Sequence, residues 1–240
     1  MKDQNGKITA VILAGGDLPD GTPPPLFVKF SGKTLFDYLA IQIIKTGITK
    51  IVICACDGTA DIVKEKFGDE YHGAEIIYSR EKEPCGTGGA LVRAMPLLDN
   101  EELLVLNGDA YIACDISSFV NWFQGIPQAD AGMLLANVEN VENLGRVLFY
   151  DDNLIYKFEG KNKFRDPGLV NAGIYMLKKS LLQSLPQDIP CSLEDDLFPK
   201  LVKESRIYGL PTIGTFVDVT SPNAQWAIRD HHQKRLHPRI

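Results

Sequence analysis

Two aspartates beside apolar segments are the residues best suited to metal chemistry. The run Leu103–Leu106 leads into Asn107-Gly108-Asp109, and Asp218 lies inside the apolar segment Thr215–Val219. A carboxylate at the carboxyl end of a strand is a hard oxygen ligand, suited to Mg²⁺ beside phosphate groups. A buried Asp218 also needs a cation, hydrogen-bond donors or a proton. Taken alone, Asp109 fits a turn or helix cap equally well.

A pair of glycines follows the first apolar run of the chain. Gly15 and Gly16 come directly after Val11–Ala14. Paired glycines let backbone N–H groups approach a phosphate without interference from a Cβ atom. The alternative is an ordinary turn, which an isolated Gly-Gly pair favours.

A second glycine-rich segment, Glu81–Ala90, joins a predicted strand to a predicted helix. It contains Gly-x-Gly-Gly but lacks the spacing of a dinucleotide fingerprint, so it is a weak signal by itself. Ser31-Gly32-Lys33-Thr34 ends like a phosphate loop. Phe27 stands where that loop needs its first glycine, which excludes a Walker site.

The elements that position these residues alternate between short apolar runs and amphipathic stretches. The predicted strands are Ile8–Leu13, Ile51–Cys54, Ala74–Tyr78 and Leu103–Leu106, and the helices between them are Thr34–Thr46, Thr59–Phe67 and Gly88–Leu97. This alternation predicts an α/β fold with a mainly parallel sheet. Ligands of such sheets bind at the carboxyl ends of the strands. The breaker-rich loop Asp17–Pro25, which follows the first strand, therefore belongs to this edge.

The second half changes rhythm to closely spaced strands, which favours a meander over crossovers. The elements expected there are strands at Gly132–Ala136, Arg146–Tyr150, Leu154–Glu159, Gly173–Leu177 and Thr215–Val219, and helices at Leu193–Lys203 and Ser221–His231. Ser221 is a suitable N-cap for the last helix, with Pro222 at its first position.

Composition limits the function classes. The chain has 240 residues, 45% of them hydrophobic, and a net charge of −6. A chain of this length builds a full core without disulfide or metal staples. The acidic balance excludes a nucleic-acid surface, and no apolar run approaches the roughly 20 residues of a membrane span. The five cysteines lack zinc spacing and are expected to be inert thiols of a reducing compartment, so we expect a cytoplasmic protein.

Six segments taken together resemble one enzyme family. They are Leu13–Gly16, Glu83–Ala90, Leu106–Asp109, Phe158–Lys161, Val170–Tyr175 and Phe216–Pro222. In this order they resemble the sugar nucleotidyltransferases, which join a nucleoside triphosphate and a sugar 1-phosphate into a nucleotide sugar and pyrophosphate. The resemblance implies a Rossmann-like three-layer sandwich with a mixed, mainly parallel sheet and a small β-rich sugar-binding part. It also implies one domain over 1–240, whose nucleotide-binding half is about 1–125 and whose sugar-binding half is about 126–240.

The resemblance assigns roles to individual residues. It implies that Asp109 and Asp218 hold Mg²⁺ and act in catalysis with Lys161, which meets the sugar phosphate. Gly145, Glu159 and Asn171 would contact the sugar. The residues implied to lie along the nucleotide are Leu13, Ala14, Gly15, Gly16, Glu81, Pro84, Gly86, Thr87, Asn107 and Gly108. The chemistry is in-line attack by a phosphate oxygen on the α-phosphorus, which needs positioning and charge neutralisation more than an acid or base.

Within the family, the chain resembles the mannose and heptose 1-phosphate guanylyltransferases, which share the Glu-Pro-x-Gly-Thr-Gly-Gly run. Thymidylyl and uridylyl relatives place a glutamine before this run, where the chain has Glu81. A carboxylate only accepts hydrogen bonds, and guanine presents two adjacent donors, N1–H and N2–H. GTP is therefore the predicted nucleotide. The alternative is that Glu81 is a solvated surface charge.

One loop departs from the family pattern. Relatives carry an arginine and a lysine in the loop after the paired glycines, whereas Asp17–Pro25 contains neither and adds two carboxylates. Lys29 is the better candidate to replace a missing cation, because Lys33 matches a structural turn of the family. The departure keeps a second hypothesis open, namely a catalytically impaired homologue that binds nucleotide or nucleotide sugar and regulates a partner. The oligomeric state, a homodimer included, stays open.

Overall fold

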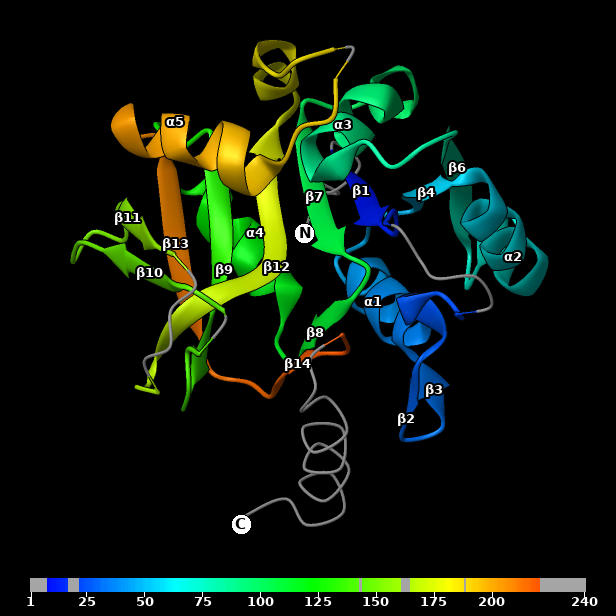
Figure 1. Ribbon diagram of the computed structural model, residues 1–240, viewed down its shortest axis with the longest axis horizontal. Helices are drawn as coiled ribbons and strands as arrows, with labels where there is room; N and C mark the ends of the chain where they lie inside the picture. Colours follow the sequence, from blue (N-terminus) through cyan, green and yellow to red (C-terminus); the bar gives the residue numbers. More distant parts are fainter. Residues whose placement is uncertain (1–7, 17–21, 143, 161–164, 188, 221–240) are drawn as a thin grey trace.

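A computed structural model describes residues 8–16, 22–142, 144–160, 165–187 and 189–220. An eight-stranded sheet runs through the molecule in the order β13-β9-β12-β7-β1-β4-β6-β5 (Figure 1). Its strands are β1 (Ile8–Leu13), β4 (Lys50–Cys56), β5 (Glu70–Tyr71), β6 (Ala74–Glu81), β7 (Glu102–Asn107), β9 (Ala131–Val138), β12 (Gly168–Lys178) and β13 (Ile207–Thr212). β12 and β5 run antiparallel to their neighbours, and the other pairs are parallel.

Helices and three small ribbons complete the fold. The helices are α1 (Leu35–Ile44), α2 (Asp57–Phe67), α3 (Gly86–Ala94), α4 (Ile116–Gln124) and α5 (Phe198–Lys203), with a π-helical turn at Leu193–Leu197 before α5. The two-stranded ribbons pair β2 (Lys29–Phe30) with β3 (Lys33–Thr34), β10 (Arg146–Phe149) with β11 (Ile155–Glu159), and β8 (Ala110–Ile112) with β14 (Phe216–Asp218).

Successive side chains of β1 point to opposite faces of the sheet and pack in two separate apolar layers. All six residues of β1 are buried, because helices cover both faces of the sheet. Ala10 and Ile12 pack with α1 and α4 in one cluster, whereas Val11 and Leu13 pack with α3 and α5 in the other. The predicted α/β three-layer sandwich with a mixed, mainly parallel sheet is confirmed.

The strand order brings two sequence motifs to the same point. β1 lies between β4 and β7 and is parallel to both, so the chain turns to opposite sides of β1 before and after α3. Such a switch of direction opens a crevice at the carboxyl ends of the strands. Leu13 is in register with Asn107, and the Gly108 amide donates to the Leu13 carbonyl at 2.8 Å. Gly15-Gly16 and Asp109 therefore lie just beyond the ends of two neighbouring strands.

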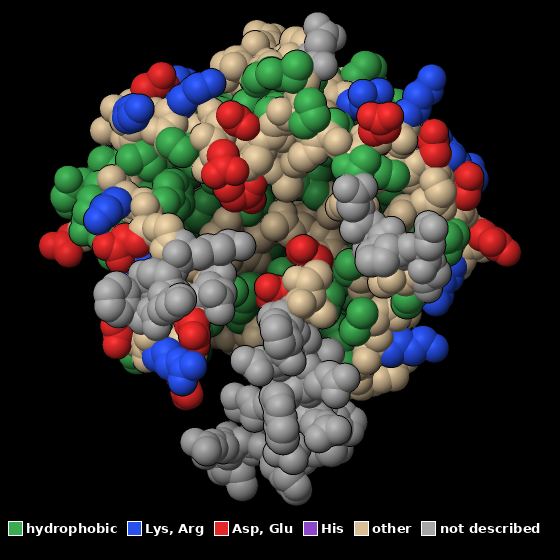
Figure 2. Space-filling model, viewed as in Figure 1, with side chains coloured by type: hydrophobic (Ala, Val, Ile, Leu, Met, Phe, Trp, Pro, Cys, Tyr) green, Lys and Arg blue, Asp and Glu red, His purple; other side chains and the backbone are tan. Residues whose placement is uncertain are grey.

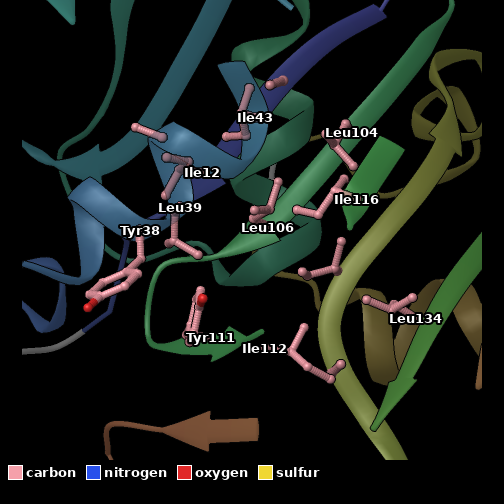
Figure 3. Close-up of a cluster of buried hydrophobic side chains, with 14 of the residues drawn as sticks. Ile12, Tyr38, Leu39, Ile43, Leu104, Leu106, Tyr111, Ile112, Ile116 and Leu134 are labelled. Carbon is pink, nitrogen blue, oxygen red and sulfur yellow. The ribbon is translucent and has the colours of Figure 1, made fainter. Parts of the chain in front are cut away.

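The short strand β8 is anchored in the core beneath this crevice. Figure 3 shows Tyr111 and Ile112 of β8 among side chains from β1, α1, β7, α4 and β9. Tyr111 and Ile112 are 6% and 0% exposed, so burial fixes the strand that follows Asp109. β14 pairs antiparallel with β8, which places Asp218 opposite Ala110.

The local structure departs from the prediction in several elements. α4, β8 and β13 were not expected, and the helix predicted at Leu193–Lys203 begins as a π-helical turn. β13 is an edge strand that contains Gly209 and Pro211, residues that weaken a strand pattern and that an edge tolerates. The expected meander is only partly present, because β10 and β11 form a separate ribbon and β13 joins β9 in parallel. The helix predicted at Ser221–His231 lies outside the described residues.

Gly108 provides a test of the junction between β1 and β7. A Cβ atom at this position would lie 2.7 Å from the Leu13 carbonyl oxygen, a backbone atom that cannot move aside. We expect Gly108→Ala to lower the free energy of unfolding by about 1–3 kcal/mol, measured in urea, as overpacked sites do. Gly58→Ala in α2 is the control, because open space surrounds that position and alanine favours a helix. Equal stability of both variants would contradict the close approach of the two strand ends.

Candidate functional site

A cavity of about 170 Å³ lies where β1, β6 and β7 end and α3 begins. Its lining is drawn from the three motifs identified in the sequence. The residues are Leu13, Gly15, Gly16, Glu81, Pro84, Cys85, Gly86, Thr87, Ala90, Asn107 and Asp109. Ala14 and Gly108, also predicted here, are chain neighbours of the lining but not part of it, and their amides donate to the carbonyls of Cys54 and Leu13. The structure thus gathers the predicted nucleotide-binding residues around one cavity.

Asn107 occupies the floor between the two halves of the chain. Its Oδ1 atom is buried and has no hydrogen-bond partner among the described residues. A Cβ atom added to Gly173 of β12 would lie 3.0 Å from the Asn107 Cβ, and Gly173 has a φ of 72°. Glycine at this bulge of β12 therefore allows the second half of the chain to approach Asn107.

The two predicted metal ligands are brought together by backbone pairing. The Val219 amide donates to the Asp109 carbonyl at 2.9 Å, and Asp218 is in register with Ala110. Both Asp109 and Asp218 are half-buried. Thr220 orients Asp218, because its amide and hydroxyl donate to Oδ1 at 2.9 and 2.7 Å.

The Asp109 carboxylate is unfavourable in this position. Burial raises its pKa above the ordinary value of 3.8, and the nearby charges of Asp218 and Glu194 raise it further. Each of these effects disfavours the ionised form. Asp109 is thus held near other carboxylates at a cost in stability, an arrangement typical of functional sites.

Glu81 reaches the same cavity from the end of β6. Glu81 is only 1% exposed, which excludes the alternative of a solvated surface charge. Oε2 accepts hydrogen bonds from the Cys85 amide at 3.3 Å and from the Cys85 thiol at 3.1 Å. Oε1 is buried and has no partner among the described residues. One oxygen of the Glu81 carboxylate is therefore left unsatisfied by the described residues.

A polar network that the sequence did not predict connects the two halves of the chain. Thr87 of α3 donates to Glu194 at 2.8 Å, and Tyr175 donates to the other oxygen of Glu194 at 3.2 Å. Asn171 donates to the Tyr175 hydroxyl at 2.8 Å. Burial, followed by the charge of Glu194, raises the pKa of Tyr175, so the phenol stays protonated. The network ties Asn171 of β12 to the cavity wall at Thr87.

The residues predicted to contact a sugar fall into two groups. Asn171 belongs to the network described above, and its Oδ1 accepts from the Gly173 amide at 2.9 Å. Glu159 of β11 is in register with Arg146 of β10 and forms ion pairs with Arg146 and Lys157. Gly145, with a φ of 79°, immediately precedes β10. Lys161 lies outside the described residues.

The cavity is acidic. None of its described lining residues is a lysine or an arginine, and Lys29, the candidate replacement cation, is exposed on the β2–β3 ribbon and is not part of the lining. Figure 2 shows a face hollowed near its centre, with Asp and Glu side chains beside the hollow and most Lys and Arg side chains toward the periphery. An anionic ligand in the cavity therefore needs a cation from elsewhere.

Comparison with known proteins agrees with this geometry. The family model described as "Nucleotidyl transferase" matches residues 9–234 of the chain. The chain belongs to the nucleotidyl transferase family. The predicted family and the predicted transferase activity are thereby confirmed.

Relatives of this nucleotidyl transferase match over most of its length. D-glycero-alpha-D-manno-heptose 1-phosphate guanylyltransferase of Campylobacter jejuni is 30% identical over 222 residues, which cover 89% of this chain and 95% of that protein. The protein of the same name from Aneurinibacillus thermoaerophilus is 26% identical over 221 residues, covering 89% and 94%.

Solved structures share the fold. HddC from Yersinia pseudotuberculosis, crystallised with GMP-PN, superposes with a TM-score of 0.76 at 25% identity and covers 93% of this chain and 99% of its own. A Bacillus anthracis structure described as a putative glucose-1-phosphate thymidylyltransferase gives a TM-score of 0.82 at 18% identity, with 93% and 94% covered. At that identity the likeness concerns the fold alone. Within the described residues, no helix of the transferase has the length and apolar character that crossing a membrane requires.

The raised pKa of Asp109 predicts a stability gain on neutralisation. A carboxyl group with a raised pKa in the folded state destabilises that state at pH values above its unfolded pKa. Asp109→Asn should therefore raise the free energy of unfolding at pH 7. The gain should shrink as the pH falls toward 3.8 and disappear well below that value, where Asp109 is neutral in both states. Urea unfolding across this range measures it.

Asp115 is the matched control for this measurement. Its carboxylate caps α4, accepting from the Ser117 amide at 3.0 Å and the Ser118 hydroxyl at 2.8 Å, and these bonds lower its pKa. Asp115→Asn should give no gain at pH 7. A destabilised Asp109→Asn variant at neutral pH would show that Asp109 is favourably paired.

Proposed function

We propose that this transferase moves GMP from GTP to the phosphate of a mannose- or heptose-type sugar 1-phosphate. A phosphate oxygen of the sugar attacks the α-phosphorus, the bond from that phosphorus to the bridging oxygen breaks, and pyrophosphate leaves. The observation that carries the proposal is the backbone pairing that brings Asp218 beside Asp109, which lines the Gly15-Gly16 cavity. The guanylyltransferase relatives support the choice of substrates.

The residues present fit a Mg²⁺ ion. Burial and the charge of Asp218 disfavour an ionised Asp109, and a divalent cation would reverse that effect. No group of three or more His, Cys, Asp or Glu side chains is placed for metal binding in the described part of the chain. Two carboxylates without a full protein cage suit Mg²⁺, which completes its shell with water and substrate phosphates. When bound, the ion would neutralise charge that develops on the transferred phosphoryl group.

The paired glycines supply the surface on which the triphosphate lies. Gly15 and Gly16 are exposed at the cavity and carry no side chain, so backbone N–H groups can approach phosphate oxygens closely. Gly16 has a φ of 145°, which suits glycine. The reaction then depends on holding the attacking oxygen in line with the leaving pyrophosphate. The protein accelerates it by positioning the reactants rather than by acid or base catalysis.

The base is recognised at Glu81. A buried carboxylate oxygen without a partner costs free energy until a ligand donates to it. Guanine offers the adjacent N1–H and N2–H donors, whereas adenine presents an acceptor at N1. GTP is therefore favoured over ATP at this position.

The sugar phosphate approaches from the side of β12. Asn171, held by Tyr175 and the Gly173 amide, is the proposed contact for a sugar hydroxyl, with Glu159 and Gly145 on or beside the β10–β11 ribbon. Lys161 is proposed to meet the sugar phosphate. The positive charge of Lys161 would offset the acidic cavity.

The acidic lining also favours a second candidate function. Without a described lysine or arginine at the cavity, phosphoryl transfer lacks a common source of transition-state stabilisation. A homologue that binds GTP or a nucleotide sugar and regulates a partner would keep Glu81 and the glycines. It would have no need for the paired aspartates, and their retention favours the enzyme.

Pyrophosphate release tests the proposal. The protein is incubated with Mg²⁺, each nucleoside triphosphate in turn and mannose, heptose and glucose 1-phosphates. We expect release with GTP and a mannose- or heptose-type acceptor. Asp218→Asn should lower kcat/KM by about 10²–10³-fold, the loss typical of removing one electrostatic contact to the transition state. Binding of GTP without release from any pair would favour the regulatory function, and full activity of Asp218→Asn would remove Asp218 from the site.

A further inference from the structure

Cys85 is placed to control the carboxylate of Glu81. Its amide and its thiol both reach Oε2, at 3.3 and 3.1 Å, while Oε1 has no partner in the described part of the chain. Glu81 is 1% exposed, so water does not freely solvate either oxygen. The two donors from one residue hold Oε2 and leave Oε1 buried without a partner among the described residues.

The thiol has the protonation state that this contact needs. Burial, followed by the hydrogen bond and charge of Glu81, raises the pKa of Cys85 to about 11. At neutral pH the sulfur therefore carries its proton and donates to the carboxylate. Cys85 is thus a hydrogen-bond donor in this position and not a reactive thiolate.

The backbone around Cys85 is fixed by a second segment. The Cys191 amide donates to the Cys85 carbonyl at 3.0 Å, and the Cys191 carbonyl accepts from the Gly88 and Gly89 amides at 3.0 and 3.2 Å. A Cβ atom on Gly86, whose φ is 75°, would lie 2.4 Å from the Cys191 oxygen. The close contact with Cys191 leaves Cys85 little freedom to move away from Glu81.

The Glu81 carboxylate lies against the paired glycines at the nucleotide cavity. A Cβ atom added to Gly15 would lie 3.5 Å from both Oε1 and Oε2, so the carboxylate rests against the paired glycines. Gly15, Glu81 and Cys85 all line the same cavity. A planar donor pair entering there meets the Glu81 carboxylate in a preset orientation.

We propose that Cys85 is a positioning residue for base selection, and that it orients Glu81 so that the carboxylate accepts from N1–H and N2–H of guanine. This inference rests on the proposed function, since it assumes that a guanine nucleotide enters the cavity. Cys85 acts through Glu81 and does not itself react. Loss of the thiol donor would leave the Glu81 carboxylate held by the Cys85 amide alone and freer to rotate, which weakens recognition of guanine.

Equilibrium binding provides the test, because it does not require turnover. The dissociation constants of GTP, ITP and ATP are measured with Mg²⁺ by calorimetry for the wild type, Cys85→Ala, Cys85→Ser and Glu81→Gln. ITP keeps N1–H and lacks the 2-amino group. We expect the wild type to bind in the order GTP, ITP, ATP. Cys85→Ala should weaken GTP binding by about fivefold, the typical value of one hydrogen bond, and leave ATP binding unchanged.

The serine variant separates positioning from packing. Cys85→Ser keeps a donor at the same place and should retain the preference for GTP over ATP, while Glu81→Gln should lose it. Cys114→Ala is the control, because Cys114 does not line the cavity.

Two results would contradict different claims. A wild-type protein without preference for GTP would overturn the assignment of guanine in the proposed function, and with it the role of Cys85. A wild type that prefers GTP, with the same GTP-to-ATP ratio in Cys85→Ala, would overturn the role of Cys85 alone. Equal losses in Cys85→Ala and Cys85→Ser would assign the effect to packing and also overturn it.

Discussion

The repulsion between Asp109 and Asp218 is the constraint on which the site depends. Backbone hydrogen bonds between β8 and β14, and from Val219 to Asp109, hold these two carboxylates close enough for their charges to interact. The buried residues Tyr111 and Ile112 fix β8, so the aspartates cannot separate without loss of core packing. The fold thus holds a charge arrangement that costs stability, which is a common property of functional sites.

The crevice was predictable because buried parallel strands leave a clear signal in the sequence. β1 and β7 are mostly apolar, and Gly15-Gly16 and Asp109 begin two residues after the strands end. Ligands of such sheets bind where the strands end, and this rule was sufficient to predict that these residues lie close together. Glu81 was identified from its place before a glycine-rich segment, and its burial could only come from the structure.

Other features were missed for physical reasons. Glu194 lies in an acidic run after Ser192, a pattern that the N-terminus of a helix favours without any ligand. Its partner Thr87 is 107 residues away in the sequence, and no local pattern reports that contact. Cys85 was treated as an inert thiol, because its role depends on the distance to Glu81. The strand β8 has only three residues, too few for a recognisable alternation.

The central claim concerns a divalent cation shared by two aspartates, and a Mg²⁺ titration of protein stability tests it most directly. A ligand that binds only the folded state raises the free energy of unfolding with its concentration. The account predicts that Mg²⁺ stabilises the wild type progressively and leaves Asp109→Asn and Asp218→Asn nearly unchanged. The same Mg²⁺-dependent stabilisation in all three proteins would contradict it, because the ion would then bind elsewhere.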